Sequence, residues 1–274
     1  MKSILYALFP FLLLTTCFSV EESAAPSITL TNESLSLTVE PAIGGRIASL
    51  KLAGQEVLNT KRDSQNVQWG STVWTSPQSD WKWPPIAAFD AKAFTVEELR
   101  ENVLLLVSER DSATLLRMRK CISLGSDNEV GLTYWLTNEG NSTVKVAVWE
   151  NTRLPYAGRI EFRADSIRFT QETNPITYRD SIATIHFDDR HSGRTKVFTD
   201  LVTDSVTYFN AGLAFTKYTT ITHLVHTAPK QAPLEIYYDP EAGFMEFELQ
   251  GEYKLLAPGE SVSLRVKWKV KESG

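Results

Sequence analysis

From Ile28 onward, apolar and polar residues alternate along the chain with a period of two. The runs Leu35–Val39 and Ile47–Leu52 both follow this pattern, and Gly44 and Gly45 lie between them. Successive side chains of a β-strand point to opposite faces, so alternation indicates a strand that is buried on one side. The pattern therefore predicts a hairpin at the start of the domain.

The same alternation recurs down the chain, separated by turn residues at intervals of about 8 to 12 residues, as is typical of β-sandwiches. Only the stretch Val96–Val107 contains enough helix formers to suggest a helix, but its apolar residues do not repeat every three or four positions, and we predict two strands. The predicted fold is all-β, an antiparallel sandwich in a single domain over residues 28–271. Further strands are predicted at 94–98, 103–107, 114–124, 129–136, 144–150, 160–162, 182–187, 206–209, 213–218, 234–238, 244–249 and 262–270.

The N-terminal segment has the features of a secretory signal. Lys2 precedes an apolar run from Ile4 to Leu14, which is too short for a membrane span of roughly 20 apolar residues. Cleavage after Ser19 would release a soluble product, whereas cleavage before Cys17 would leave a lipid-anchored one. We therefore predict a signal peptide over residues 1–19, a tether over 20–27, and an exported protein that is periplasmic, extracellular or an outer-membrane lipoprotein. Any contact with a membrane would be through the anchor at Cys17.

Composition narrows the possible partners. The chain has 28 Lys and Arg residues against 33 Asp and Glu residues, a net charge of −5, which argues against binding to a nucleic-acid backbone. Of the two cysteines, only Cys121 lies beyond the signal, so no intrachain disulfide is expected. Because Cys121 lies in an alternating segment, we interpret it as a core residue.

Four of the seven tryptophans fall between Trp69 and Pro85. Three prolines in the same stretch cannot donate strand hydrogen bonds, so we predict a rigid loop there rather than a core strand. Tryptophan rings on such a loop suit the C–H faces of a sugar, and neighbouring polar groups suit its hydroxyls. The alternative is that the rings only plug the open end of the sandwich. The predicted ligand contacts in this segment are Trp74, Gln78, Trp81 and Trp83.

Several short motifs resemble a known family. They are Gly44-Gly45-Arg46-Ile47, the Trp-Gly-Ser-Thr-x-Trp-x-Ser-Pro-Gln segment, Trp149-Glu150-Asn151-Thr152-Arg153, Phe215-Thr216-Lys217 and Ala257-Pro258-Gly259-Glu260-Ser261. Together they resemble an uncharacterised family of exported bacterial proteins that is itself similar to the galactose mutarotase-like superfamily of aldose 1-epimerases and hexose-phosphate epimerases. The resemblance covers about residues 28–270, and it implies a β-supersandwich with a sugar cleft on its concave face.

The resemblance also implies residue roles. Mutarotases use a His as general acid and a Glu as general base, because ring opening needs a proton delivered on one side of the sugar and taken on the other. The base corresponds to Glu248 or Glu246, which alternation places on one strand face, although that face could equally be solvent-exposed. The segment that carries the acid has no His here, and Glu150 could serve only with a raised pKa. We expect instead that Glu150 pairs with Arg153 beside the ligand.

The same resemblance predicts two further ligand contacts, both with cationic side chains. Lys217 lies beside Phe215 in a predicted strand and Arg46 follows two glycines, and we expect both to contact the ligand. His186, Asp188, Asp189 and His191 include metal-ligand types, but their spacing fits no closed zinc motif, and His223 and His226 would point to opposite faces of a strand. We therefore predict no metal and no cofactor.

The function predicted from the sequence is that of a monomeric, exported carbohydrate-binding protein. Two alternatives are an aldose 1-epimerase-like enzyme with Glu248 as base and a non-catalytic envelope scaffold.

Overall fold

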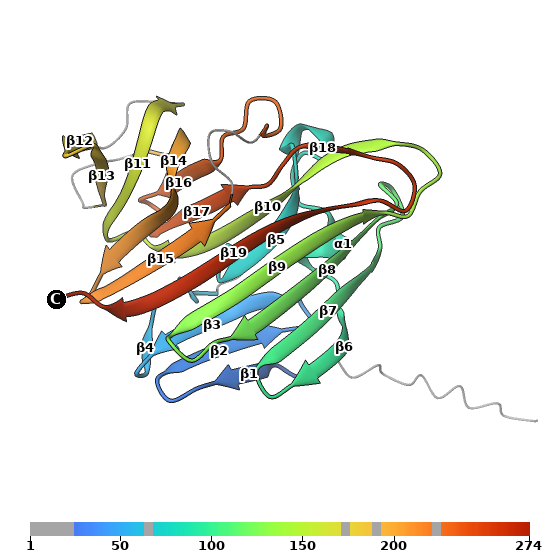
Figure 1. The fold of residues 1–274 in the computed structure, drawn as a ribbon, viewed down its shortest axis with the longest axis horizontal. Coiled ribbons are helices and arrows are strands. Elements are labelled where there is room, and N and C mark those ends of the chain that lie inside the picture. The colour runs from blue at the N-terminus through green and yellow to red at the C-terminus, as the bar shows by residue number, and fades with distance from the viewer. Residues whose placement is uncertain (1–24, 63–67, 171–175, 188–192, 221–225) are drawn as a thin grey trace, which may run out of the picture.

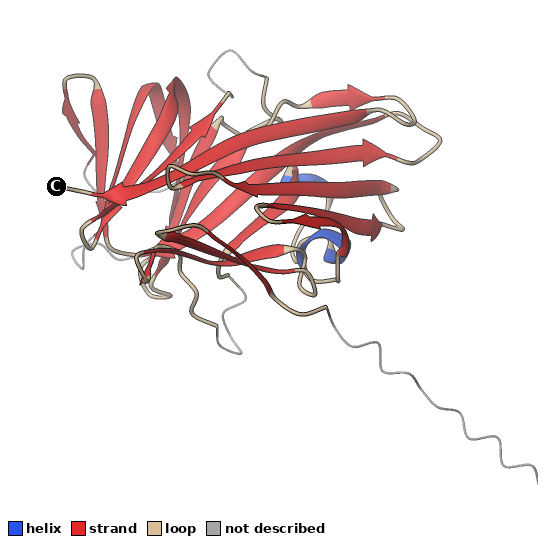
Figure 2. Ribbon diagram, turned by 60° about the horizontal axis from the view of Figure 1, so that its bottom comes forward, coloured by secondary structure: helices blue, strands red, loops and turns tan. Residues whose placement is uncertain are grey.

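The computed structural model describes residues 25–62, 68–170, 176–187, 193–220 and 226–274, and these form an almost entirely antiparallel β structure (Figures 1 and 2). The strands pair into two layers that face each other across one core. The first layer runs β6 (Thr95–Arg100), β7 (Val103–Arg110), β8 (Leu116–Leu124), β9 (Glu129–Asn138), β19 (Ser261–Glu272) and β15 (Leu213–Thr219). The second runs β1 (Ile28–Thr31), β2 (Leu35–Glu40), β3 (Arg46–Leu52), β5 (Ser71–Ser76), β10 (Val144–Pro155), β17 (Phe244–Gln250) and β16 (Leu234–Asp239).

The long strand β14 (Thr195–Asn210) joins the two layers. Its first half pairs with β16 and its second half with β15. Three strands continue the network beside β14, and two short strands and two short helices complete the fold. These are β11 (Gly158–Phe169), β12 (Ile176–Arg179), β13 (Ile182–Phe187), β4 (Gln55–Glu56), β18 (Lys254–Leu256), the 3-10 turn η1 (Gln78–Asp80) and α1 (Ala87–Asp90).

The core lies between the layers and is built from alternate residues of both. Phe215 of the first layer meets Phe247 of the second, with ring centroids 6.2 Å apart, and also packs against Trp268 of its own layer at 5.3 Å. Each such side chain contributes roughly 1.5–3 kcal/mol by leaving water. The prediction of an all-β sandwich is confirmed, as are the first hairpin, now β2 and β3, and the two strands β6 and β7 in place of a helix.

Two predictions were wrong. Ser71–Ser76 is a fully buried strand, so Trp74 lies on a strand and only the residues after Ser76 form the proline-rich loop. The prolines all follow the strand, which is why they do not interrupt it. Cys121 is half-buried rather than in the core, because the alternation of β8 turns its neighbours Lys120 and Ile122 inward and Cys121 outward.

No helix within the described ranges has the length and apolar character needed to cross a membrane.

Candidate functional site

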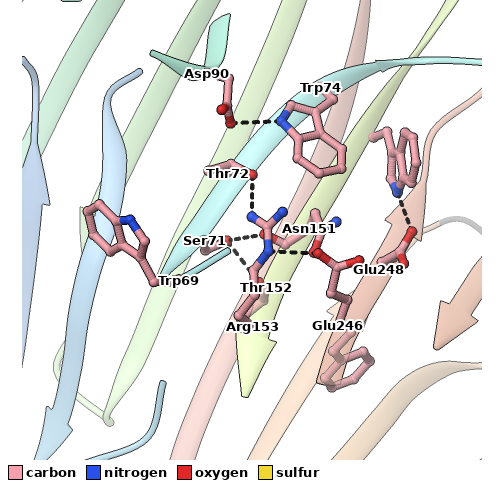
Figure 3. Close-up of polar contacts among 12 residues, drawn as sticks. Trp69, Ser71, Thr72, Trp74, Asp90, Asn151, Thr152, Arg153, Glu246 and Glu248 are labelled. Carbon is pink, nitrogen blue, oxygen red and sulfur yellow. Dashed lines mark hydrogen bonds and ion pairs between the residues drawn. The ribbon is translucent and has the colours of Figure 1, made fainter. Parts of the chain in front are cut away.

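Three neighbouring strands of the second layer present polar side chains on the face that points away from the core. In β10, Trp149, Asn151 and Arg153 alternate with inward residues. Register places Thr72 of β5 opposite Asn151 on one side and Glu248 of β17 opposite it on the other. We call this set of side chains the tryptophan–carboxylate face; it comprises Thr72, Trp74, Trp149, Asn151, Arg153, Glu246 and Glu248. Figure 3 labels all of them except Trp149.

Tryptophans cluster at one end of this face. The ring of Trp74 lies 5.2 Å from Trp149, 5.9 Å from Trp81 and 6.2 Å from Trp83, measured between centroids, and all three meet it edge to face. Trp74 and Trp149 are buried, Trp81 is half-buried, and Trp83 is 53% exposed. The cluster thus has a fixed floor and an aromatic rim open to solvent.

Hydrogen bonds hold the rings in place. The indole N–H of Trp74 donates to Asp90 Oδ1 at 2.8 Å, that of Trp81 to the carbonyl of Thr75 at 2.9 Å, and that of Trp149 to Glu248 Oε2 at 2.7 Å. A buried indole that has its partner loses no hydrogen bond on folding, so its orientation is strongly specified.

Asp90 is itself held by the turn before β3. It ends α1 and accepts from Arg46 at 3.1 Å, and its carbonyl lies so close to Gly44 that a Cβ there would approach to 2.4 Å. Lys120 donates to the Gly44 carbonyl at 2.6 Å from across the core, where burial lowers the pKa of Lys120 to about 7. Arg46, predicted to contact the ligand, is buried here and positions Asp90.

Arg153 lies at the centre of the face and is fully enclosed. Its Nε donates to Glu246 Oε1 at 2.9 Å and its Nη1 to Thr72 Oγ1 at 2.6 Å, while its guanidinium lies 4.8 Å from the centre of the Trp74 ring (Figure 3). The predicted pairing of Arg153 with Glu150 was wrong: Glu150 points to the opposite face of β10, and the partner of Arg153 comes from β17.

Lys196 of β14 reaches over the face and bonds two carboxylates. Its Nζ lies 2.7 Å from Glu235 Oε2 and 2.9 Å from Glu248 Oε2, and 4.7 Å from the centre of the Trp149 ring. Burial disfavours the charge of Lys196, but Glu248 and Glu235 outweigh it and raise the pKa of the amine.

The local charges do not balance. Among the described residues, Glu235, Glu246 and Glu248 form ion pairs with two cations, Lys196 and Arg153. Burial, together with repulsion from Glu246 and Glu235, therefore raises the pKa of Glu248 to about 8 despite the attraction of Lys196. Glu248 can hold or release a proton near neutral pH.

Two buried groups on this face have unused hydrogen-bonding capacity. Both amide atoms of Asn151 and the Oε1 atom of Glu248 are enclosed without a hydrogen-bond partner in the described part of the chain. Burying such a group unpaired costs about 1–3 kcal/mol. Asn151 and Glu248 are paired residues of adjacent strands, so their side chains are neighbours on this face.

Comparison with known proteins agrees with this architecture. A family model described as a domain of unknown function, DUF4380, matches residues 26–271. The chain belongs to the DUF4380 family. No curated protein matches its sequence.

Among solved structures, this DUF4380 chain is similar in fold to aldose 1-epimerase and galactose mutarotase-like proteins. A putative aldose 1-epimerase from Escherichia coli K12 superimposes with a TM-score of 0.62 at 16% identity, covering 90% of this chain and 99% of the other. A galactose mutarotase-like protein from Lactobacillus casei ATCC 334 gives 0.65 at 14% identity, covering 90% and 100%. A homologue of aldose epimerase from C. elegans gives 0.61 at 10% identity, covering 91% and 99%. The galactose mutarotase-like β-sandwich fold is thereby confirmed.

Apart from Arg46, which holds Asp90, the structure separates the predicted site residues into two groups. Trp74, Trp81, Trp83, Arg153, Glu246 and Glu248 lie together, and Gln78 lies half-buried in η1 beside the tryptophan loop. Glu246 and Glu248 share one face as expected, but they are buried and not solvent-side residues.

Glu150 and Lys217 form the second group, inside the core. Lys217 Nζ lies 2.7 Å from Glu150 Oε2 and also donates to Thr152 Oγ1 and the carbonyl of Phe247, each at 2.8 Å. Both side chains are fully enclosed, and burial lowers the pKa of Lys217 to about 8 even beside Glu150. They therefore join the two layers, and a ligand on the tryptophan–carboxylate face would not touch them.

Sequence reasoning missed several members of the face. Asn151 and Trp149 share the strand alternation of Arg153, so that signal could have found them, whereas Lys196 and Glu235 reach the face through pairing of distant strands. The described residues contain no group of three or more His, Cys, Asp or Glu side chains arranged to hold a metal ion. Asp188, Asp189, His191 and His223 lie outside the described residues, and His186 and His226 are exposed.

Proposed function

We propose that this chain is an exported carbohydrate-binding protein whose ligand lies on the tryptophan–carboxylate face. The observation that carries the proposal is the free hydrogen-bonding capacity of Asn151 and Glu248 directly beside a tryptophan cluster. A sugar suits both features, because its hydroxyls can donate to and accept from the unpaired atoms while its C–H faces stack on the tryptophan rings.

The geometry favours a neutral sugar. The Asn151 amide can both donate and accept. Glu248 Oε1 accepts a hydrogen bond when the carboxylate is ionised and donates one when it is protonated, so two neighbouring hydroxyls satisfy these atoms in either state. Arg153 and Lys196 already have carboxylate partners, which leaves no unpaired cation for an anionic ligand among the described residues of this face. Trp83 and Trp81 at the rim would stack on the exposed side of the ring.

A second candidate function is that of an aldose 1-epimerase-like enzyme. The specific support is Glu248, whose raised pKa of about 8 suits a general base near neutral pH and whose buried Oε1 atom has no hydrogen-bond partner among the described residues. Ring opening also needs a proton donor, and within the described residues the face contains no His. Binding without chemistry is therefore the first proposal.

Export is proposed from the sequence alone. Lys2 and the apolar run Ile4–Leu14 support a signal, and the two cleavage sites before Cys17 and after Ser19 predict products of different mass. Mass spectrometry of the protein from its native membrane and periplasmic fractions distinguishes them.

A thermal-shift screen against neutral mono- and oligosaccharides tests the binding function. A bound sugar at 100 times its dissociation constant stabilises the fold by about 2.7 kcal/mol, whatever the subsequent chemistry. Trp83→Ala should weaken the shift, whereas Tyr178→Ala, which removes an aromatic ring 63% exposed on β12, should leave it unchanged. Equal shifts for both variants would place the ligand elsewhere.

Anomer-exchange NMR on each sugar that binds then separates binder from enzyme. The binder hypothesis predicts exchange at the uncatalysed rate for both the wild type and Glu248→Gln. Acceleration by the wild type that Glu248→Gln abolishes would replace the binder with the enzyme.

A further inference from the structure

A groove of about 590 Å³ lies on the solvent side of the first layer, on the opposite side of the core from the tryptophan–carboxylate face. Its size is within the range of about 300–1,000 Å³ typical of small-ligand sites. We call it the outer groove; it is lined chiefly by Cys121, Thr133, Asp204, Tyr218, Arg265 and Lys267.

Strand register arranges these side chains in two neighbouring rows. One row crosses the sheet through Cys121, Thr133 and Arg265, and the next through Ser123, Gly131, Lys267 and Tyr218. A row over four strands is about 14 Å long, at about 4.8 Å between strands. The hydroxyl of Ser123 fills the space beside Gly131 and donates to the Gly131 carbonyl at 3.3 Å, so the second row is built of small groups at this point. An elongated ligand would lie across the strands over these two rows.

The outer groove carries exposed positive charge in a protein whose net charge is −5. Arg265 has no ion pair with any described residue, and Lys267 is only loosely paired, 3.3 Å from Glu129 with both side chains partly exposed. The Nζ atom of Lys267 also lies 4.7 Å from the centre of the Tyr218 ring. Asp204 lines the groove as its acidic group.

We propose that the outer groove is a second binding site, specific for an acidic oligosaccharide that carries carboxylates. The planar guanidinium of Arg265 matches a carboxylate through two parallel hydrogen bonds. The hydroxyls of Thr133 and Ser123 suit sugar hydroxyls, and the Tyr218 ring supplies an apolar face beside Lys267. The site differs in ligand charge from the tryptophan–carboxylate face, where the cations are paired, and it does not depend on the function proposed there.

Isothermal titration of the mature protein with α-1,4-linked trigalacturonate, at low and at moderate salt, tests this site. A neutral trisaccharide of the same length serves as the ligand control. We expect saturable binding of trigalacturonate that weakens as salt screens the charges, and at least about tenfold weaker binding of the neutral sugar.

Two variants locate the site. Arg265→Gln combined with Lys267→Gln should reduce the affinity for trigalacturonate at least about tenfold, and Arg265→Lys should retain part of it. Lys271→Gln removes an exposed charge from the same strand outside the groove and should change little. Glu248→Gln should also leave the binding of trigalacturonate intact, so the proposals for the two sites are tested independently.

The proposal is overturned if trigalacturonate does not bind at low salt, or if the double variant and Lys271→Gln weaken binding equally. Binding to vesicles containing phosphatidylglycerol that is lost in the double variant, without any binding of trigalacturonate, would also overturn it, because the occupant would then be a membrane surface.

Discussion

Replacing Lys217 with methionine should destabilise the fold severely without altering the tryptophan–carboxylate face. The side chain is fully enclosed, and its three donors bond Glu150 at 2.7 Å, Thr152 at 2.8 Å and the Phe247 carbonyl at 2.8 Å. In Lys217→Met, Glu150 keeps only the hydrogen bond from Thr152 Oγ1 at 3.0 Å and remains buried as an uncompensated charge.

Breaking a buried pair by removing one partner costs about 3–5 kcal/mol. For a domain of this size, that lowers the melting temperature by about 10 °C. Urea unfolding followed by tryptophan fluorescence measures the loss, and Lys217→Met with Glu150→Leu should recover most of it, because an apolar pair of similar volume needs no charge compensation. The double variant also provides a folded protein if the single variant does not fold.

A free energy of unfolding for Lys217→Met within about 1 kcal/mol of the wild type would refute this reasoning, since a charge left buried and unpaired cannot cost so little. So would a double variant that is no more stable than the single one. If Lys217 instead contacted a ligand, as its sequence context suggests, the stable double variant would lose binding.

Two further outcomes are expected. Because the pKa of Glu248 is raised from its ordinary value of 4.5 to about 8 in the folded state, the folded protein keeps a proton between these two pH values that the unfolded protein releases. Stability should therefore fall as pH rises through this window. Glu248→Gln should flatten the dependence of melting temperature on pH, and an unchanged slope would contradict the prediction. Gly44→Ala should lower the free energy of unfolding, measured in urea, by at least about 1 kcal/mol more than Gly54→Ala. Both glycines have a positive φ, but only a Cβ at Gly44 would meet a neighbour, the Asp90 carbonyl at 2.4 Å. Equal losses would show that Asp90 is not held by this turn.

Much of the fold follows from the alternation of single residues. Wherever a strand has one face in the core and one in water, as in β8 and β19, the period of two is clear and the predicted strand matches. Ser71–Ser76 departs from this rule because both of its faces are buried, and the neighbouring prolines and tryptophans suggested a loop.

Burial of both strand faces also limits prediction of the site. Nearly every residue of β10 and β17 is buried, so polarity does not reveal which face points into the core. Glu150 and Arg153 are three residues apart and therefore on opposite faces, yet both are polar and enclosed. Alternation places Glu246 and Glu248 together, but only the pairing of β14, β16 and β17 brings Lys196 to Glu248, 52 positions away in the sequence.

Asn151→Leu provides the most direct test that the tryptophan–carboxylate face is a ligand site. Because both amide atoms of Asn151 are buried without partners in the described chain, a leucine of similar size removes an unpaired polar group and should leave the free energy of unfolding unchanged or raise it. Saturation-transfer NMR with the sugars that stabilise the wild type measures binding to both proteins. We expect the variant to be at least as stable as the wild type and no longer to bind the sugar. A destabilised variant, or one that binds as well as the wild type, would contradict the assignment of this face as a ligand site.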